Sequence, residues 1–209
     1  MIRDDEVMLK ELRDITRDKE CWKSSIGYVA ACLDDDSSDE VKAKALWLLG
    51  EMGLKHPEKI DAYVDDIASY IDDDNPKLRE RSANALGRIG RANHKLAVPY
   101  LDRLMELRHD ESANVKHSFV WACENIASNA PEIFCENLDM FYGMISDSSD
   151  KVRIEAPEMF RVIGKRKPEH VVPYIERLEW ICENDENRIV RIHCRGAIRA
   201  TEKSLKKKQ

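Results

Sequence analysis

The chain has 209 residues, of which 43% are hydrophobic and 35% are charged, with only 8 glycines and 7 prolines. This composition excludes a chain that is disordered throughout and favours helices over turn-rich β-structure. The formal net charge of -6 argues against a protein that coats nucleic acid, because phosphate binding depends on neutralisation by lysine and arginine.

No apolar run approaches the roughly 18 residues that a membrane-spanning helix requires, and the first residues lack the apolar segment of a signal peptide. We therefore expect a cytoplasmic protein with no membrane association and with its six cysteines reduced. The sequence has no C-x-x-C pair and no His-Glu dipeptide, and its six histidines are scattered. We therefore expect no metal site and no cofactor.

Two helices are expected first, at residues 3–17 and 22–33, and together they form a degenerate capping repeat. Four similar segments follow, and their first apolar residues are spaced 37 residues apart. A fifth copy begins 38 residues after the fourth. These anchor residues are Val41, Leu78, Val115, Val152 and Val190.

Each full copy contains two amphipathic runs with helical spacing, and three of the second runs open with a proline, at Pro57, Pro131 and Pro168. A hairpin of about 37 residues cannot bury its own apolar faces and must stack on its neighbours. We therefore predict an all-α fold, an α-α superhelix of about five helical hairpins. The expected single domain covers 1–205, with a cap at 1–36, full repeats at 37–74, 75–111, 112–148 and 149–186, and a half repeat at 187–202, before a basic polar tail at 203–209.

Two further columns recur with the repeat: an aspartate five residues before each anchor and a basic residue one position after it. With the Ala and Leu-Gly positions of 73–90, DDNPKLRERSANALGRIG, this pattern resembles the HEAT-repeat family over about residues 34–202. The resemblance implies that the two columns form a structural ladder linking adjacent repeats. An aspartate near a helix start is also expected to accept backbone N–H bonds. The ladder residues are Asp36, Lys42, Asp73, Arg79, Asp110, Lys116, Asp147, Arg153, Asp185 and Arg191.

In each full repeat, an acidic residue stands at the same non-core position of the second helix. Next to it runs a mixed column that contains Asp66 and Arg103. The HEAT resemblance implies that second helices line a concave groove, where this column would form an acidic wall. A merely solvated face is the open alternative, because two charges 8–10 Å apart in water repel by only about 0.5 kcal/mol. The candidate partner-binding residues are Asp65, Asp102, Glu106, Asp139, Met140, Glu176, Arg177 and Trp180.

No catalytic constellation is recognisable in the sequence, so we expect a non-catalytic scaffold or adaptor that binds a basic or mixed-charge protein segment, as a monomer or weak oligomer. The alternative is a HEAT-like nucleic-acid binder or alkylpurine DNA glycosylase. It would use the basic turns at 91–95 and 165–167 together with the tryptophans, by base stacking and phosphate contacts. These tryptophans are Trp22, Trp47, Trp121 and Trp180.

Overall fold

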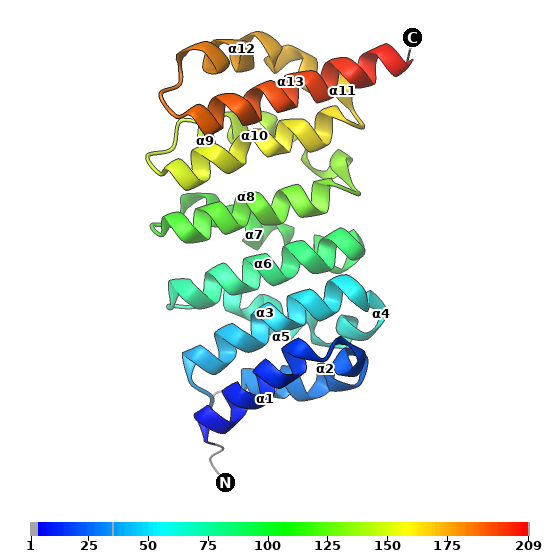
Figure 1. Ribbon diagram of the computed structural model, residues 1–209, viewed down its shortest axis with the longest axis vertical. Helices are drawn as coiled ribbons and strands as arrows, with labels where there is room; N and C mark the ends of the chain where they lie inside the picture. Colours follow the sequence, from blue (N-terminus) through cyan, green and yellow to red (C-terminus); the bar gives the residue numbers. More distant parts are fainter. Residues whose placement is uncertain (1–3, 35, 209) are drawn as a thin grey trace. The chain divides into compact units, whose positions relative to one another are not determined.

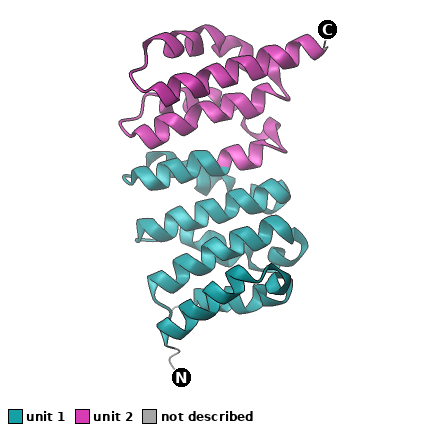
Figure 2. Cartoon of the chain, viewed as in Figure 1, with its two compact units in different colours: residues 1–122 teal, residues 123–209 magenta. Residues whose placement is uncertain are grey.

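The computed structural model describes residues 4–34 and 36–208, and every regular element within these ranges is helical (Figure 1). The expected all-α fold is confirmed. Residue 3, where the first helix was expected to begin, lies outside the described residues. The chain divides into two compact units, residues 1–122 and 123–209 (Figure 2). The expected single domain and its repeat boundaries stay predictions.

Unit 1 contains the capping hairpin, two full repeats and most of the next first helix. The capping hairpin consists of α1 (Asp5–Arg17), η1 (Lys19–Cys21), α2 (Trp22–Ala30) and η2 (Ala31–Leu33). The first full repeat is α3 (Asp39–Lys55), α4 (Pro57–Ile60), η3 (Asp61–Tyr63), α5 (Val64–Ser69) and η4 (Tyr70–Asp72). The second is α6 (Pro76–Ala92), η5 (His94–Leu96), η6 (Val98–Tyr100), α7 (Leu101–Glu106) and η7 (Leu107–His109), and α8 (Ala113–Ala127) follows.

Unit 2 begins within the last turns of α8 and ends with the half repeat. Its elements are η8 (Pro131–Asn137), α9 (Leu138–Met144), α10 (Asp150–Gly164), α11 (Pro168–Val171), η9 (Val172–Tyr174), α12 (Ile175–Asn184) and α13 (Arg188–Lys208). The tail expected from residue 203 is therefore helical through Lys208. The hydroxyl of Ser204 donates to the carbonyl of Lys165 at 3.0 Å, which ties this last part of α13 to the end of α10.

The first helices of the repeats are long because each has a capped start and an uninterrupted apolar face. Ser38 caps α3 by accepting a backbone N–H at 3.4 Å, and Asn75 caps α6 in the same way at 2.8 Å. Their inner faces bury side chains such as Leu48 and Leu86 completely. Burial of one such side chain stabilises the fold by about 1.5–3 kcal/mol, so these helices form the core of each repeat.

Glycines allow the first helices of unit 1 to pack closely. A Cβ atom added at Gly50 of α3 would lie 2.7 Å from the Cα of Ala85 in α6. The same position one repeat later is Gly87, where a Cβ would lie 2.6 Å from the Cα of Ala122 in α8. These are contacts with backbone atoms, which cannot move without shifting a whole helix.

The second halves of the repeats are series of short α and 3-10 segments, which corrects the single second helix expected from the sequence. Pro57, Pro131 and Pro168 are the first residues of α4, η8 and α11, as expected for a residue without a backbone N–H donor. Pro99 and Pro173 lie within η6 and η9. The equivalent segment of the first full repeat, η3, is also 3-10 but contains no proline, so these prolines are compatible with the 3-10 turn and are not required for it.

The turns that precede the first helices are held by the predicted aspartates. Asp73, Asp110, Asp147 and Asp185 each accept the backbone N–H two residues ahead, at 2.7–2.8 Å. Asp36 differs: it is exposed, and its own N–H donates to Asp34 at 3.0 Å. Four of the five turns therefore share one local hydrogen-bonding pattern.

Two arginines of the basic column join one turn to the next. In unit 1, Arg79 pairs with Asp110 through Nε at 2.7 Å and Nη2 at 3.0 Å. In unit 2, Nη2 of Arg153 donates to Asp185 at 2.6 Å. Arg191 follows the last turn and donates to the backbone carbonyl of Asp185. Arg79 and Arg153 therefore each connect two successive turns within their own unit.

Candidate functional site

The second halves of the repeats in unit 1, α4 to η4 and η5 to η7, form a surface that we call the second-helix face. This face exposes the acidic residues that the repeat pattern predicted. Asp65 lies on α5 and Asp102 on α7, and both side chains are exposed. The first helices of unit 1, α3, α6 and α8, form what we call the first-helix layer. Val64 and Leu104, next to these aspartates, are buried on the side of α5 and α7 that faces this layer. The 37-residue spacing thus places one carboxylate per repeat on the solvent side of this layer. In unit 2, α9 and α12 present Asp139 and Glu176 in the same way.

Tyrosines from the following repeat contact two of these four carboxylates. The hydroxyl of Tyr100 donates to Asp65, and the hydroxyl of Tyr174 donates to Asp139. Burial, followed by the hydrogen bond to Asp65, raises the pKa of Tyr100 to about 12. The same two causes, in the same order, raise the pKa of Tyr174. Both tyrosines therefore remain neutral donors at neutral pH.

Sequence reasoning missed these tyrosines, although a signal was present. Each is the third residue of a Val-Pro-Tyr triplet, at residues 98–100 and 172–174, and each lies 35 residues after the aspartate that it contacts. Each triplet forms one 3-10 turn. That turn brings the tyrosine to the aspartate of the preceding repeat.

Arginines lie among the acidic residues of the second-helix face, and one of them pairs with the acidic column. Arg103 donates through Nε to Asp72 at 2.8 Å. In unit 2, Nη1 of Arg177 lies 3.5 Å from Asp139, and its guanidinium lies 5.4 Å and 5.7 Å from the ring centres of Tyr142 and Tyr174. The second-helix face is therefore mixed in charge and does not form a bare acidic wall.

The remaining predicted site residues have fewer partners. Asp102 and Glu176 make no ion pair within residues 4–34 and 36–208. Glu106 accepts from Arg108 at 3.2 Å. Met140 is half-buried on α9, and Trp180 on α12 is 63% exposed. The structure brings Asp65, Asp102 and Glu106 together on the second-helix face of unit 1. The other five predicted residues lie in unit 2.

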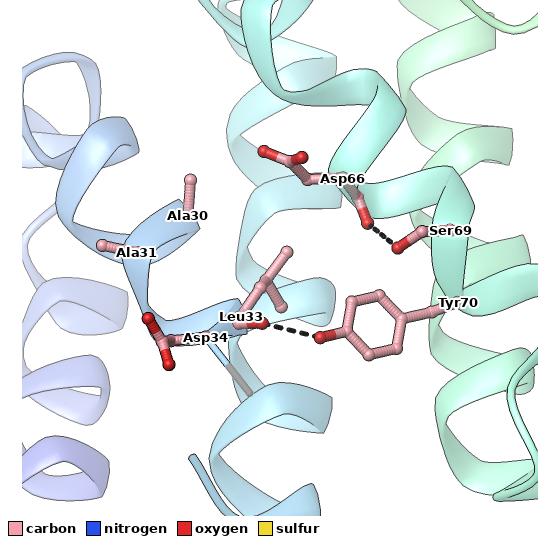
Figure 3. Close-up of a pocket in the computed structure, with 7 residues that line it drawn as sticks. All are labelled: Ala30, Ala31, Leu33, Asp34, Asp66, Ser69 and Tyr70. Carbon is pink, nitrogen blue, oxygen red and sulfur yellow. Dashed lines mark hydrogen bonds between the residues drawn. The ribbon is translucent and has the colours of Figure 1, made fainter. Parts of the chain in front are cut away.

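A hollow of about 340 Å³ lies in unit 1 between the capping hairpin and the first full repeat (Figure 3). We call it the Tyr70 hollow. Tyr70 closes one side by donating its hydroxyl to the carbonyl of Leu33 at 2.7 Å. Ser69 donates to the backbone carbonyl of Asp66 at 2.7 Å, so its hydroxyl proton is already engaged. The lining residues are Ala30, Ala31, Leu33, Asp34, Asp66, Ser69 and Tyr70.

The Tyr70 hollow is lined by apolar side chains and by two exposed carboxylates. Asp34 and Asp66 have no basic partner among the residues that the structure describes, although Asp34 accepts the N–H of Asp36. Alanine and leucine side chains together with the tyrosine ring can contact an aliphatic chain, and carboxylates can bind a cation at its end. Neither aspartate was among the predicted site residues, because the hollow depends on how two hairpins pack.

The tryptophans that the nucleic-acid alternative requires for base stacking are dispersed over the chain. Trp22 is 4% exposed, and its indole N–H donates to the carbonyl of Ile15 at 2.9 Å, so it cannot stack on a base. Trp47 and Trp121 lie on α3 and α8, in the first-helix layer of unit 1. Trp180 lies on α12, in the second half of a repeat of unit 2. The tryptophans therefore do not converge within either unit.

The described residues contain no cluster of three or more histidine, cysteine or acidic residues that could hold a metal ion. All six cysteines are free. Burial raises the pKa of the Cys123 thiol well above its ordinary value, and burial also raises that of Cys194 to about 12. Two of the thiols are therefore poor nucleophiles. None of the described helices is both long enough and apolar enough to span a membrane.

Comparison with known proteins agrees with this architecture. Residues 28–106 match the family model of HEAT repeats. An engineered protein of solved structure aligns with a TM-score of 0.74 at 15% identity, over 96% of this chain and 92% of that one. A designed armadillo repeat protein in complex with the peptide (KR)4 aligns with a TM-score of 0.70 at 23% identity, over 95% of this chain and 94% of that one.

This chain has a HEAT/armadillo-like repeat fold. The predicted fold class is thereby confirmed. A computationally designed armadillo repeat protein for modular peptide recognition aligns with the repeat protein at a TM-score of 0.61 and 18% identity, covering 94% of this chain and 99% of that one. No curated protein matches its sequence.

Proposed function

We propose that the repeat protein is a non-catalytic scaffold that binds an extended, basic or mixed-charge peptide segment on the second-helix face of unit 1. One lysine or arginine side chain of that segment enters the Tyr70 hollow. The observation that carries the proposal is the pair of exposed carboxylates, Asp34 and Asp66, in one hollow with Leu33 and Tyr70. The peptide's cation supplies the counter-charge that the described residues do not provide.

The size of the Tyr70 hollow supports a side chain as its occupant. Pockets that enclose drug-sized molecules span roughly 300–1,000 Å³, and this hollow, at about 340 Å³, lies near the lower limit. The aliphatic part of a lysine or arginine can lie along Leu33 and the ring of Tyr70 while its charged end remains near water. Asp102, one repeat further along the same unit, can attract a second basic residue.

The comparison with the designed armadillo repeat protein supports the same partner chemistry, because that protein is in complex with the alternating basic peptide (KR)4. Individual contacts at a wet surface contribute only about 0–1 kcal/mol. Affinity must therefore come from several contacts along an extended segment. A repeated face with one carboxylate per repeat suits that requirement.

A titration of a fluorescently labelled (KR)4 peptide tests the proposal. Fluorescence anisotropy should detect binding to wild type at low salt, and Asp66→Asn combined with Asp34→Asn should weaken it about three- to tenfold. Asparagine at position 34 can still accept the N–H of Asp36, so the turn is preserved. Glu111→Gln, in the exposed turn before α8, is the matched control that removes a negative charge elsewhere in unit 1. Equal weakening by the control would show that only net charge matters.

A further inference from the structure

Unit 1 has a second hollow, which lies on the first-helix layer, whereas the Tyr70 hollow lies among the second halves of the hairpins. It lies between α3 and α6 and has a volume of about 380 Å³. We call it the Trp47 hollow. Its wall is the half-buried indole of Trp47, and Ala43 leaves room beside that ring. The lining residues are Glu40, Ala43, Lys44, Trp47, Lys77 and Arg81.

The repeat explains why these basic residues converge. Lys44 and Arg81 occupy the same position of successive first helices, 37 residues apart. Because α3 and α6 pack side by side, equivalent positions become neighbours across the interface. One repeat further, this position is Ser118, which accepts a hydrogen bond from Asn84 at 3.1 Å. The basic cluster is therefore specific to the α3–α6 pair within unit 1.

The cations at the Trp47 hollow exceed the carboxylates. Lys77 pairs with Glu80 at 2.9 Å, and Arg81 lies 4.0 Å from the same carboxylate. Lys44 has no carboxylate partner within the described residues, and its ammonium lies 4.2 Å from the Trp47 ring centre. Burial and the nearby charges of Arg13 and Arg81 lower the pKa of Lys44.

The charge balance indicates the kind of ligand. The cations are Arg13, Lys44, Lys77 and Arg81, and the carboxylates are Glu40 and Glu80, which leaves two uncompensated positive charges. A phosphomonoester carries about 1.5 to 2 negative charges at pH 7 and three acceptor oxygens. Lysine and arginine are its usual protein donors. A carboxylate would bring only half of the required charge.

We propose that the Trp47 hollow binds a phosphomonoester group carried on a flat, apolar ring. The phosphate contacts Lys44 and Arg81, and the ring lies against the indole of Trp47. This site is on the first-helix layer, so it is independent of peptide binding on the second-helix face. A phosphate seated there also relieves the repulsion among the clustered cations.

Phenyl phosphate is the probe, and ¹H–¹⁵N spectra of the full chain report on the four tryptophan indoles. The Trp47 indole signal, assigned with Trp47→Phe, should shift on titration. Lys44→Gln and Arg81→Gln should each weaken binding about tenfold, the effect of losing one charge-assisted hydrogen bond. Lys59→Gln removes an exposed lysine from α4 and should change the affinity less than twofold. Unfolding curves of each variant show whether the fold is intact.

Phenol, benzoate and inorganic phosphate separate the contributions of ring and charge. The proposal requires phenyl phosphate to bind more tightly than all three. Equal affinity for benzoate would overturn the assignment of a dianion, and equal affinity for inorganic phosphate would overturn the role of the indole wall. An unshifted Trp47 signal, or unchanged affinity in a folded Lys44→Gln variant, would overturn the site itself. Weakened phenyl phosphate binding with unchanged (KR)4 binding in that variant supports two independent sites.

Discussion

Arg79 binds both carboxylate oxygens of Asp110, and its remaining terminal nitrogen donates to the carbonyl of Asp73 at 2.8 Å. One guanidinium thus joins the turn before its own helix to the turn before the next first helix. The side chain of Arg79 is 19% exposed and that of Asp110 is 7% exposed, so solvent screens the pair only weakly. The hydrogen bonding that Arg79 donates to Asp110 is the main cause that raises the pKa of Arg79.

Arg79→Ala should therefore lower the free energy of unfolding by about 1–3 kcal/mol, because it leaves a partly buried carboxylate and a backbone carbonyl without their donor. Urea denaturation followed by circular dichroism measures the change. Lys77→Ala on the same helix is the control, since the side chain of Lys77 is 48% exposed and its pair with Glu80 should contribute less than about 1 kcal/mol. Equal losses in the two variants would contradict a special role for the turn-to-turn contact.

The Arg79–Asp110 contact should also weaken in acid. Burial raises the pKa of Asp110, but the hydrogen bonds from Arg79 and from the N–H of Ser112 outweigh it and the pKa is lowered. A lowered folded-state pKa gives stability that is fully present above the ordinary aspartate value of about 3.9 and is lost as pH falls through the folded value. The stability difference between wild type and Arg79→Ala should stay constant from pH 7 to about 5 and shrink below about pH 4. A constant difference at pH 3 would refute the linkage.

Helix packing predicts opposite effects for two glycine substitutions. Gly50→Ala places a methyl group 2.7 Å from the Cα of Ala85, a backbone atom, so α3 and α6 must separate. We expect a loss of about 1–3 kcal/mol, typical of overpacking. Gly143 on α9 has no heavy atom within 4 Å of the added Cβ, so Gly143→Ala should stabilise by up to about 1 kcal/mol through helix propensity. Thermal unfolding of both variants checks the signs, and destabilisation by both would contradict this account.

The first helices could be predicted from the sequence because their formation depends on local patterns. A capping residue, a repeated apolar face and a fixed 37-residue period together define each one, as in α6 after Asn75. The second halves were predicted less well. A 3-10 segment interrupts the α conformation there, and the periodicity of the apolar residues does not reveal the break. The tyrosine contacts follow directly from those breaks.

The candidate site was predicted only in part, because its residues act through neighbours in other repeats. The positions of Asp65 and Asp139 follow from the period, but their contacts with Tyr100 and Tyr174 require the 3-10 turns. The Tyr70 hollow depends on the packing of the degenerate cap, whose spacing does not follow the repeat. A sequence column shows which residues share a position, whereas burial and pairing depend on the adjacent hairpin.

Asp102 and Asp139 share a repeat position but differ in their contacts. Asp102 is exposed and makes no ion pair among the described residues, whereas Asp139 accepts from Tyr174 and lies 3.5 Å from Arg177. Asp102→Lys should therefore leave the free energy of unfolding within about 0.5 kcal/mol of wild type. Asp139→Lys loses these contacts and sets a second cation beside Arg177, so we expect a loss of about 1 kcal/mol.

Association with (KR)4 should respond to the charge at position 102, because Asp102 lies in the unit that contains the Tyr70 hollow. Stopped-flow fluorescence should show Asp102→Lys slowing association several-fold at about 20 mM salt. The effect should fade above about 150 mM, where the Debye length is about 8 Å. Asp102→Asn, which removes the charge without reversing it, should give an intermediate rate. Equal association rates for all three proteins at every salt concentration would show that Asp102 is only a solvated residue and that the peptide binds elsewhere.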